Sequence, residues 1–190
     1  MLLTIWVIAG PAGCGKTTVA EYVSKTLEAP FVEGDSLHSP ENIRKMAAND
    51  PLTDEDREPW LKSIVPACIQ AAGLHSTGTK SHNCVVTCSS LRHRYRNIIR
   101  DAARHERDHR GLSVHVRFIY LTADEETLLA RVHRRENHYM KESMVFSQVK
   151  LQELPSVSEQ IDSLIINVTG KTPEQVNAAA LKAINELKTS

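Results

Sequence analysis

The chain lacks an excess of charge of either sign, because its 190 residues include 23 Lys and Arg and 23 Asp and Glu. A dedicated nucleic-acid-binding domain usually carries a basic excess, so that class of function is disfavoured. The basic stretch 92–110 is interleaved with Asp101, Glu106 and Asp108, which favours a solvated helix face over a nucleic-acid surface. No apolar run approaches the roughly 18 residues that a membrane-spanning helix needs. We therefore expect neither nucleic acid nor a membrane among the partners of this chain.

Cysteines are few, and their spacing is not that of a metal or redox motif. The four, Cys14, Cys68, Cys84 and Cys88, include no Cys-x-x-Cys pair. We expect all four to be reduced, as is usual in the cytosol. We also expect no secretory signal, since the apolar start at 2–9 has no basic residues before it and runs directly into a glycine-rich motif. The chain is therefore predicted to be cytoplasmic.

The remaining composition is that of an ordinary folded domain, with 41% hydrophobic and 24% charged residues. A length of 190 residues suits one compact domain, so we expect a single domain over 1–190. Apolar runs alternate with segments of helical spacing. The predicted strands are 2–9, 30–33, 83–88, 114–121 and 161–168. The predicted helices are 16–27, 40–49, one that opens at 53 and runs through 64, 92–109, 124–134, 144–154 and 173–187. This order predicts an α/β fold in which a five-stranded parallel sheet is covered by helices on both faces.

The segment Gly10-Pro-Ala-Gly-Cys-Gly-Lys16-Thr17 matches the phosphate-binding pattern G-x-x-x-x-G-K-[ST] without deviation. It follows a predicted strand and opens a predicted helix, as its mechanism requires. Glycines let backbone N–H groups surround a phosphate, and the positive end of the helix dipole points at the same anion. Lys16 is predicted to contact the β- and γ-phosphates of ATP, and the Thr17 hydroxyl to ligate Mg²⁺. The residues assigned to ATP binding are Gly10, Ala12, Gly13, Cys14, Gly15, Lys16, Thr17 and Thr18.

The P-loop does not by itself distinguish a kinase from an ATPase or a GTPase switch. The chain has no Asn-Lys-x-Asp segment for guanine recognition, and the strand at 83–88 is followed by Ser-Ser and ends without an acid. Asp35 follows the second strand instead, at the edge where open α/β sheets bind ligands. A carboxylate there suits a group that accepts the proton of the acceptor hydroxyl, orients that hydroxyl or holds Mg²⁺ through water. An Asp in a tight turn is common without any function, but the P-loop beside it favours a catalytic role here.

Basic residues gather at 131–138, where Arg131 and Arg135 are spaced to project from one helix face, with Arg134 and His138 beside them. The polar segment that follows suits a small lid over ATP, at about 131–142. Arginines on a lid would neutralise the charge on the transferring phosphoryl oxygens and help to exclude water. Arg131 and Arg135 are therefore predicted as catalytic residues, although a basic helix end is also a common solvated feature.

Further segments resemble the gluconokinase family of small P-loop kinases along most of the chain. The family carries a segment similar to Gly-Asp-Ser-Leu-His at 34–38, and an Asp-Arg and Pro-Trp-Leu block similar to 51–61 that looks specific to it. The other matching positions are 42–46, 88–91, Tyr95, Arg96, Arg100, Arg131, Arg135, 138–140, 147–148 and 151–155. The resemblance implies a three-layer P-loop NTPase fold of the nucleoside- and shikimate-kinase type.

The resemblance implies that the chain transfers the γ-phosphoryl group of ATP, with Mg²⁺, to the 6-hydroxyl of D-gluconate. The product, 6-phosphogluconate, enters the pentose phosphate pathway, and members are usually cytoplasmic homodimers. The residues implied to contact the sugar acid are Asp35, His38, Lys45, Arg57, Arg92, Arg96 and His138. Such a set suits a ligand that combines a carboxylate with a chain of hydroxyls. The segment 169–176 occupies the place where such kinases often hold adenine.

Two other interpretations of the sequence stay open. A kinase acting on shikimate or on a nucleoside would use the same P-loop, and shikimate is also a carboxylate with hydroxyls. The block at 54–60 favours gluconate, and an aromatic content of 5% disfavours the base stacking that a nucleoside would use. A non-catalytic nucleotide-binding switch would lack the acid or the lid, whereas Asp35 and the cluster at 131–138 are both present.

Overall fold

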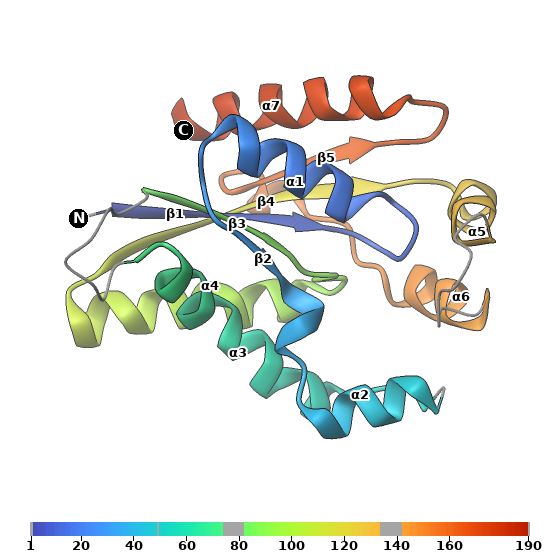
Figure 1. Ribbon diagram of the computed structural model, residues 1–190, viewed down its shortest axis with the longest axis horizontal. Helices are drawn as coiled ribbons and strands as arrows, with labels where there is room; N and C mark the ends of the chain where they lie inside the picture. The colour runs from blue at the N-terminus through green and yellow to red at the C-terminus, as the bar shows by residue number, and fades with distance from the viewer. Residues whose placement is uncertain (1, 49, 74–81, 134–141, 190) are drawn as a thin grey trace.

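One parallel sheet of five strands organises the chain, with the strand order β2-β3-β1-β4-β5 (Figure 1). The computed structural model describes residues 2–48, 50–73, 82–133 and 142–189. The strands are β1 (Leu2–Ala9), β2 (Phe31–Glu33), β3 (Asn83–Thr87), β4 (Ser113–Thr122) and β5 (Ser163–Asn167). Every pairing in the sheet is parallel. The predicted α/β fold with five parallel strands is therefore confirmed.

Helices cover both faces of the sheet and complete three layers (Figure 1). One face carries α1 (Lys16–Thr26) and α7 (Pro173–Thr189), and the other carries α3 (Asp54–Ala71) and α4 (His93–Arg110). The shorter elements are η1 (Gly34–Leu37), α2 (Pro40–Ala47), α5 (Glu125–His133), α6 (Glu142–Leu151) and η2 (Val157–Glu159). None of the helices in the described ranges has both the length and the apolar content to cross a membrane.

The core follows from the two-residue period of the central strand. Leu3, Ile5 and Val7 of β1 point to the face covered by α3 and α4, whereas Trp6 and Ile8 point to the face covered by α1 and α7. All five are fully buried. A strand buried on both sides must be apolar throughout, which is why 2–9 reads as a continuous hydrophobic run.

Two helix starts use the capping residues that the sequence indicates. The Ser39 hydroxyl accepts a hydrogen bond from the Asn42 N–H, and Pro40 occupies the first turn of α2. Thr53 and Asp56 form a reciprocal capping box at the start of α3. These caps fix the direction of the chain as it leaves the carboxyl edge of β2.

Two predicted boundaries near the carboxyl end were wrong by two or three residues. The helix predicted to reach 154 ends at Leu151, because the Glu153 N–H leaves the helical pattern and donates to the Leu91 carbonyl at 2.8 Å. The strand predicted from 161 begins at Ser163, because the Asp162 N–H closes a turn onto the Glu159 carbonyl at 3.0 Å. Both differences come from long-range or turn hydrogen bonds that local hydrophobicity does not report.

Candidate active site

The P-loop lies between β1 and α1 at the carboxyl edge of the sheet, with its glycines in conformations that other residues rarely adopt. Gly10 and Gly13 have φ values of 132° and 81°. A Cβ on Gly10 would lie 2.2 Å from the Leu121 carbonyl oxygen, and one on Gly13 would lie 2.8 Å from the Leu128 carbonyl oxygen. Only glycine fits at these two positions, so the loop can wrap closely against β4 and α5.

The first turn of α1 opens directly from this loop. Gly15, at the N-cap, has a φ of 95°, and no side chain caps the helix there. The first N–H groups of a helix have no intrahelical partner, and together with the helix dipole they form a site for an anion. The Lys16 ammonium bends back to the Pro11 carbonyl at 3.0 Å, so it lies over the loop. This geometry matches the phosphate cradle that the motif predicts.

A carboxylate meets the Thr17 hydroxyl beside the loop, and it belongs to Glu33. Thr17 Oγ1 donates to Glu33 Oε2 at 3.3 Å, and the hydroxyl of Thr87 donates to Glu33 Oε1. Thr87 also accepts the Gly34 N–H at 3.1 Å. Thr87 ends β3, where many P-loop proteins carry an acid, and here it holds the acid of the neighbouring strand β2. Sequence reasoning missed Glu33, because it meets Thr17 and Thr87 only once β2 is paired with β3.

Asp35 lies two residues after Glu33, in η1, with its side chain exposed. The same turn carries His38, whose ring stacks on Trp60 with centroids 4.0 Å apart. Trp60 Nε1 donates to the Gly34 carbonyl at 2.7 Å and so fixes the turn against α3. His38 is only 8% exposed, and its Nδ1 has no hydrogen-bond partner within the described residues. Burial and the charge of Arg57 lower the pKa of His38, although Asp35 opposes this shift, so the ring is neutral near pH 7.

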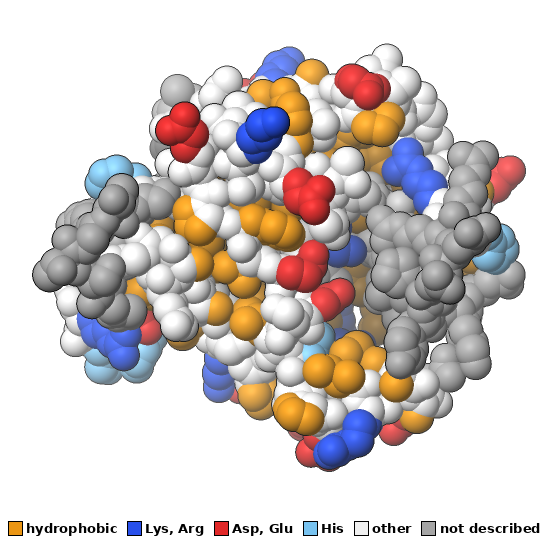
Figure 2. Space-filling view, in the orientation of Figure 1, with side chains coloured by type: hydrophobic (Ala, Val, Ile, Leu, Met, Phe, Trp, Pro, Cys, Tyr) orange, Lys and Arg blue, Asp and Glu red, His pale blue; other side chains and the backbone are white. Residues whose placement is uncertain are grey.

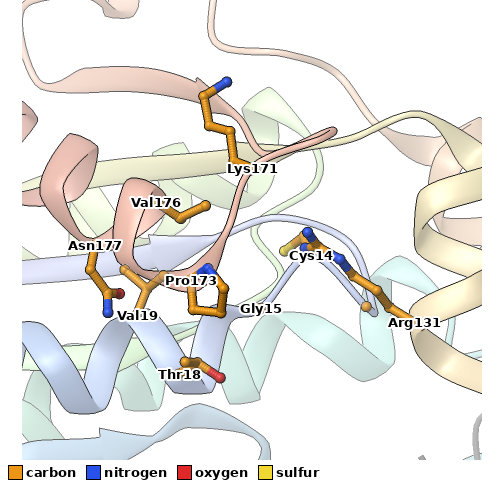
Figure 3. Close-up of a pocket in the computed structure, with 10 residues that line it drawn as sticks. Cys14, Gly15, Thr18, Val19, Arg131, Lys171, Pro173, Val176 and Asn177 are labelled. Carbon is orange, nitrogen blue, oxygen red and sulfur yellow. The ribbon is translucent and has the colours of Figure 1, made fainter. Parts of the chain in front are cut away.

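A cavity of about 420 Å³ adjoins the P-loop on its α7 side (Figure 3). Figure 3 shows Val19 of α1 near Pro173 and Val176 of α7, with Arg131 reaching from α5 towards Cys14. Arg131 Nη2 also donates to the Val168 carbonyl at 3.3 Å. The cavity thus combines apolar side chains with the glycine backbone and a guanidinium, a combination that suits a nucleotide. The segment 169–176 contributes to its wall, as expected for adenine, and that assignment stays a prediction.

The cysteine thiols near the P-loop are unreactive. All four cysteines are free, as the sequence predicts, and all four are buried. Burial raises the pKa of the Cys14 thiol, although the charge of Lys16 opposes this. Burial also raises the pKa of Cys88 to about 12. Both thiols therefore stay neutral at physiological pH and act as small packing groups.

Three predicted acceptor contacts, Lys45, Arg57 and Arg92, lie around the starts of α3 and α4. Asp54 accepts from Arg92 at 3.2 Å and from the Tyr95 hydroxyl, while the guanidiniums of Arg57 and Arg92 both lie 5.8 Å from the Tyr95 ring. The hydrogen bond from Tyr95, together with nearby arginines, lowers the pKa of Asp54. Lys45 pairs with Asp56 at 2.7 Å and so braces the start of α3.

Arg96, also predicted as an acceptor contact, is fully buried in this structure. It pairs with Glu159 through two hydrogen bonds of 2.7 and 2.9 Å. Its Nη1 donates to the carbonyls of Ser90 at 3.1 Å and Glu153 at 2.9 Å. Because Arg96 has no exposed surface, it supports the loop after β3 and does not reach an acceptor directly.

Another contact that sequence reasoning missed joins α6 to the P-loop. The Ala12 N–H donates to Gln148 Oε1 at 2.7 Å. Gln148 lies in α6, which follows the predicted lid in the chain. Of the predicted lid residues, Arg135 and His138 lie outside the described residues.

The face that carries these groups is hollowed between the body of the molecule and the end that bears α2 (Figure 2). Acidic side chains lie beside the hollow, and basic side chains lie deeper within it. A groove with both signs of charge can hold an anionic nucleotide together with an acid that acts on a hydroxyl.

Comparisons with known proteins show what the whole chain is similar to. Residues 7–153 match a family model described as an AAA domain. A probable gluconokinase of Schizosaccharomyces pombe is 41% identical over 97% of this chain and 91% of its own length. The thermosensitive gluconokinase of Escherichia coli K12 is 36% identical over 91% of this chain and 87% of its own length. The crystal structure of a gluconokinase from Sinorhizobium meliloti 1021 has a TM-score of 0.77 and 32% identity, and covers 97% of this chain and 93% of its own.

Proposed function

The chain belongs to the gluconokinase family, and we propose that it transfers the γ-phosphoryl group of ATP to the 6-hydroxyl of D-gluconate, which yields 6-phospho-D-gluconate. The observation that carries the proposal is the convergence of the P-loop, Glu33 and Asp35 at one edge of the sheet. This constellation holds a nucleotide and a hydroxyl-activating acid side by side, in a chain whose relatives across nearly its full length are gluconokinases.

The phosphates of ATP lie in the P-loop in this proposal. The backbone N–H groups from Gly13 to Thr17 surround them, and Lys16 turns from the Pro11 carbonyl to the β- and γ-phosphates. Arg131 reaches the same cavity from α5 and neutralises charge on the phosphoryl group. Arg135 and His138 complete the lid in the same proposal, and their contribution is to exclude water from the transfer.

Mg²⁺ fits the oxygen donors beside the loop. The Thr17 hydroxyl and the Glu33 carboxylate are hard oxygen ligands 3.3 Å apart, and Mg²⁺ typically takes one or two such protein groups with waters and substrate phosphates. No cluster of three or more His, Cys, Asp or Glu side chains that could hold a metal occurs in the described ranges. That result agrees with an ion held largely by the nucleotide. When bound, the ion would neutralise negative charge on the phosphates.

Asp35 acts on the acceptor. Its exposed carboxylate, at the carboxyl end of β2, accepts the proton of the 6-hydroxyl or orients that hydroxyl towards the γ-phosphorus. His38 follows Asp35 in the same turn and is assigned to a hydroxyl of the sugar acid. Arg57 and Arg92, which flank the Tyr95 ring, bind the carboxylate end.

Lys45 and Arg96 hold this acceptor side in place. Lys45 does so through the start of α3, and Arg96 through the loop after β3.

The setting of the enzyme is part of the proposal. We infer a single domain over 1–190 that works as a cytoplasmic homodimer and supplies 6-phosphogluconate to the pentose phosphate pathway. The balanced charge of the chain supports small-molecule partners in preference to nucleic acid.

A coupled assay of ADP release with Mg-ATP tests the proposal across a panel of acceptors. The panel holds D-gluconate, shikimate, glycerate, a nucleoside and a blank without acceptor. Release that depends on gluconate supports the assignment. ADP release that depends on another acceptor would support kinase activity but overturn the roles of His38, Arg57 and Arg92. ADP release at the same rate with and without every acceptor would overturn phosphoryl transfer to a metabolite.

A further inference from the structure

A second cavity, of about 260 Å³, lies at the opposite edge of the sheet from the P-loop. Its walls come from α4, from the start of β4 and from the turn before β5. Because Leu2 pairs with Ser113, the start of β4 lies beside the amino end of β1, whereas the P-loop follows the carboxyl end. An eight-residue strand separates the two sites by about 25 Å. This cavity is therefore not part of the active site.

Basic side chains dominate its lining. Four arginines and a histidine line the cavity with a single carboxylate, namely Arg100, Arg104, Arg107, Arg117, His115 and Asp162. Among the residues that line the cavity, arginines therefore outnumber carboxylates, although the whole chain has no net charge. Such an excess of arginines in a groove raises the local concentration of anions.

One wall of the cavity is fixed by partly buried hydrogen bonds. Arg100 donates to the Asp162 carboxylate through Nε and Nη2, both at 2.7 Å, and to Glu159 at 3.1 Å. Its guanidinium also lies 5.0 Å from the centre of the Phe118 ring. Arg100 is therefore already neutralised, and it provides a rigid wall with little cost of ordering when a ligand binds.

The other three guanidiniums have donors to spare. Within the described residues, each makes a single side-chain hydrogen bond: Arg104 to Asp101, Arg107 to Asp108, and Arg117 to the Ile161 carbonyl. The side chains of Arg104 and Arg107 are 57% and 59% exposed, and exposed ion pairs of this kind contribute little. A bound anion can therefore pair with the guanidiniums of Arg104 and Arg107, and the exposed ion pairs that it replaces cost little free energy.

We propose that this cavity, the Arg117 groove, binds the phosphate group of a small phosphate monoester. A guanidinium presents paired donors that match phosphate oxygens, and a phosphate dianion requires more than one such partner. Arg104 and Arg107 line the cavity from α4, and Arg117 and His115 line it from the start of β4. The volume leaves room beside the phosphate for a short organic chain. A monocarboxylate would use only part of this charge.

Solution NMR of the full chain tests the site through the imidazole of His115, whose signal is assigned by comparison with His115→Gln. The nucleotide site is first filled with saturating Mg-ADP, so that the P-loop does not compete for phosphate. Glycerol 3-phosphate is then titrated, with glycerol as the uncharged control. The groove predicts a saturable shift of the His115 signal with glycerol 3-phosphate, weakened by added salt, and none with glycerol.

Two double variants decide whether the guanidiniums are responsible. Arg104→Gln/Arg107→Gln should raise the dissociation constant at least about tenfold, because two charge-assisted contacts are lost. The matched control, Lys62→Gln/Lys182→Gln, removes the same charge from exposed pairs outside the groove and should change it less than about twofold. A wild-type protein without a saturable shift, or equal weakening in the two double variants, would overturn the proposal.

Discussion

Replacing Arg96 by Met tests whether this buried guanidinium is a support or a ligand contact. The variant keeps the size and flexibility of the side chain but loses both hydrogen bonds to Glu159 and those to the carbonyls of Ser90 and Glu153. Glu159 is only 4% exposed, so it would be left as a buried carboxylate without its main partner. Removing one partner of a buried ion pair typically costs about 3–5 kcal/mol.

The remaining partners of Glu159 place the expected loss at the lower end of that range. Arg100 and His93 stay within 3.1 Å of the carboxylate, and the Ser156 N–H still donates at 3.1 Å. We therefore expect Arg96→Met to lower the free energy of unfolding by about 3 kcal/mol. Equilibrium urea unfolding, followed by the fluorescence of the buried Trp6 and Trp60, measures it.

Arg104→Met is the matched control, because its only described ion pair is exposed, and the expected change is within about 0.5 kcal/mol. A loss below about 1 kcal/mol for Arg96→Met, with an unchanged m-value, would refute the supporting role. If that variant instead stayed stable and showed a large increase in the KM for gluconate, Arg96 would be a direct contact to the acceptor.

Four further substitutions probe the chemistry and its electrostatics. Lys16→Ala should remove most turnover while urea unfolding stays near that of the wild type, and an unchanged kcat/KM would contradict the P-loop assignment. Asp35→Asn should lower kcat far more than it weakens ATP binding. Glu33→Gln should mainly raise the Mg²⁺ concentration needed for the half-maximal rate. If Asp35→Asn instead raised the Mg²⁺ requirement and Glu33→Gln lowered kcat, the two residues would have each other's roles. Burial opposes the ionisation of Glu159, but hydrogen bonds from Arg96, a backbone N–H and His93 hold its pKa well below the usual range. The stability that Glu159 adds over Glu159→Gln should therefore be complete above about pH 4.5 and decline as the pH falls below it, and a difference independent of pH would contradict this.

Hydrophobic periodicity and the P-loop were enough to predict the fold. The apolar run at 2–9 could only be a doubly buried strand, and the glycine-rich motif after it placed the phosphate site at one edge of the sheet. Capping residues such as Ser39 and Thr53 marked helix starts, because their hydroxyls accept hydrogen bonds from N–H groups that have no partner within the helix. These signals are local, so the sequence displays them directly.

The acceptor side was harder to predict because its roles depend on contacts between distant residues. Glu33 meets Thr17 and Thr87 only after β2 pairs with β3, and no spacing in the chain records that meeting. Arg96 resembled a ligand contact in the sequence, since nothing local shows that Glu159, 63 residues later, neutralises it. Charged residues can either serve a ligand or support a loop, and burial decides between the two.

Transfer of label from [γ-³²P]ATP tests the central claim most directly. The protein is incubated with Mg²⁺ and D-gluconate, and the labelled products are separated and identified. The account predicts that the label appears in 6-phosphogluconate, at a rate that depends on gluconate and is largely lost in Asp35→Asn. Label found only in inorganic phosphate, or on an acceptor other than gluconate, would contradict it.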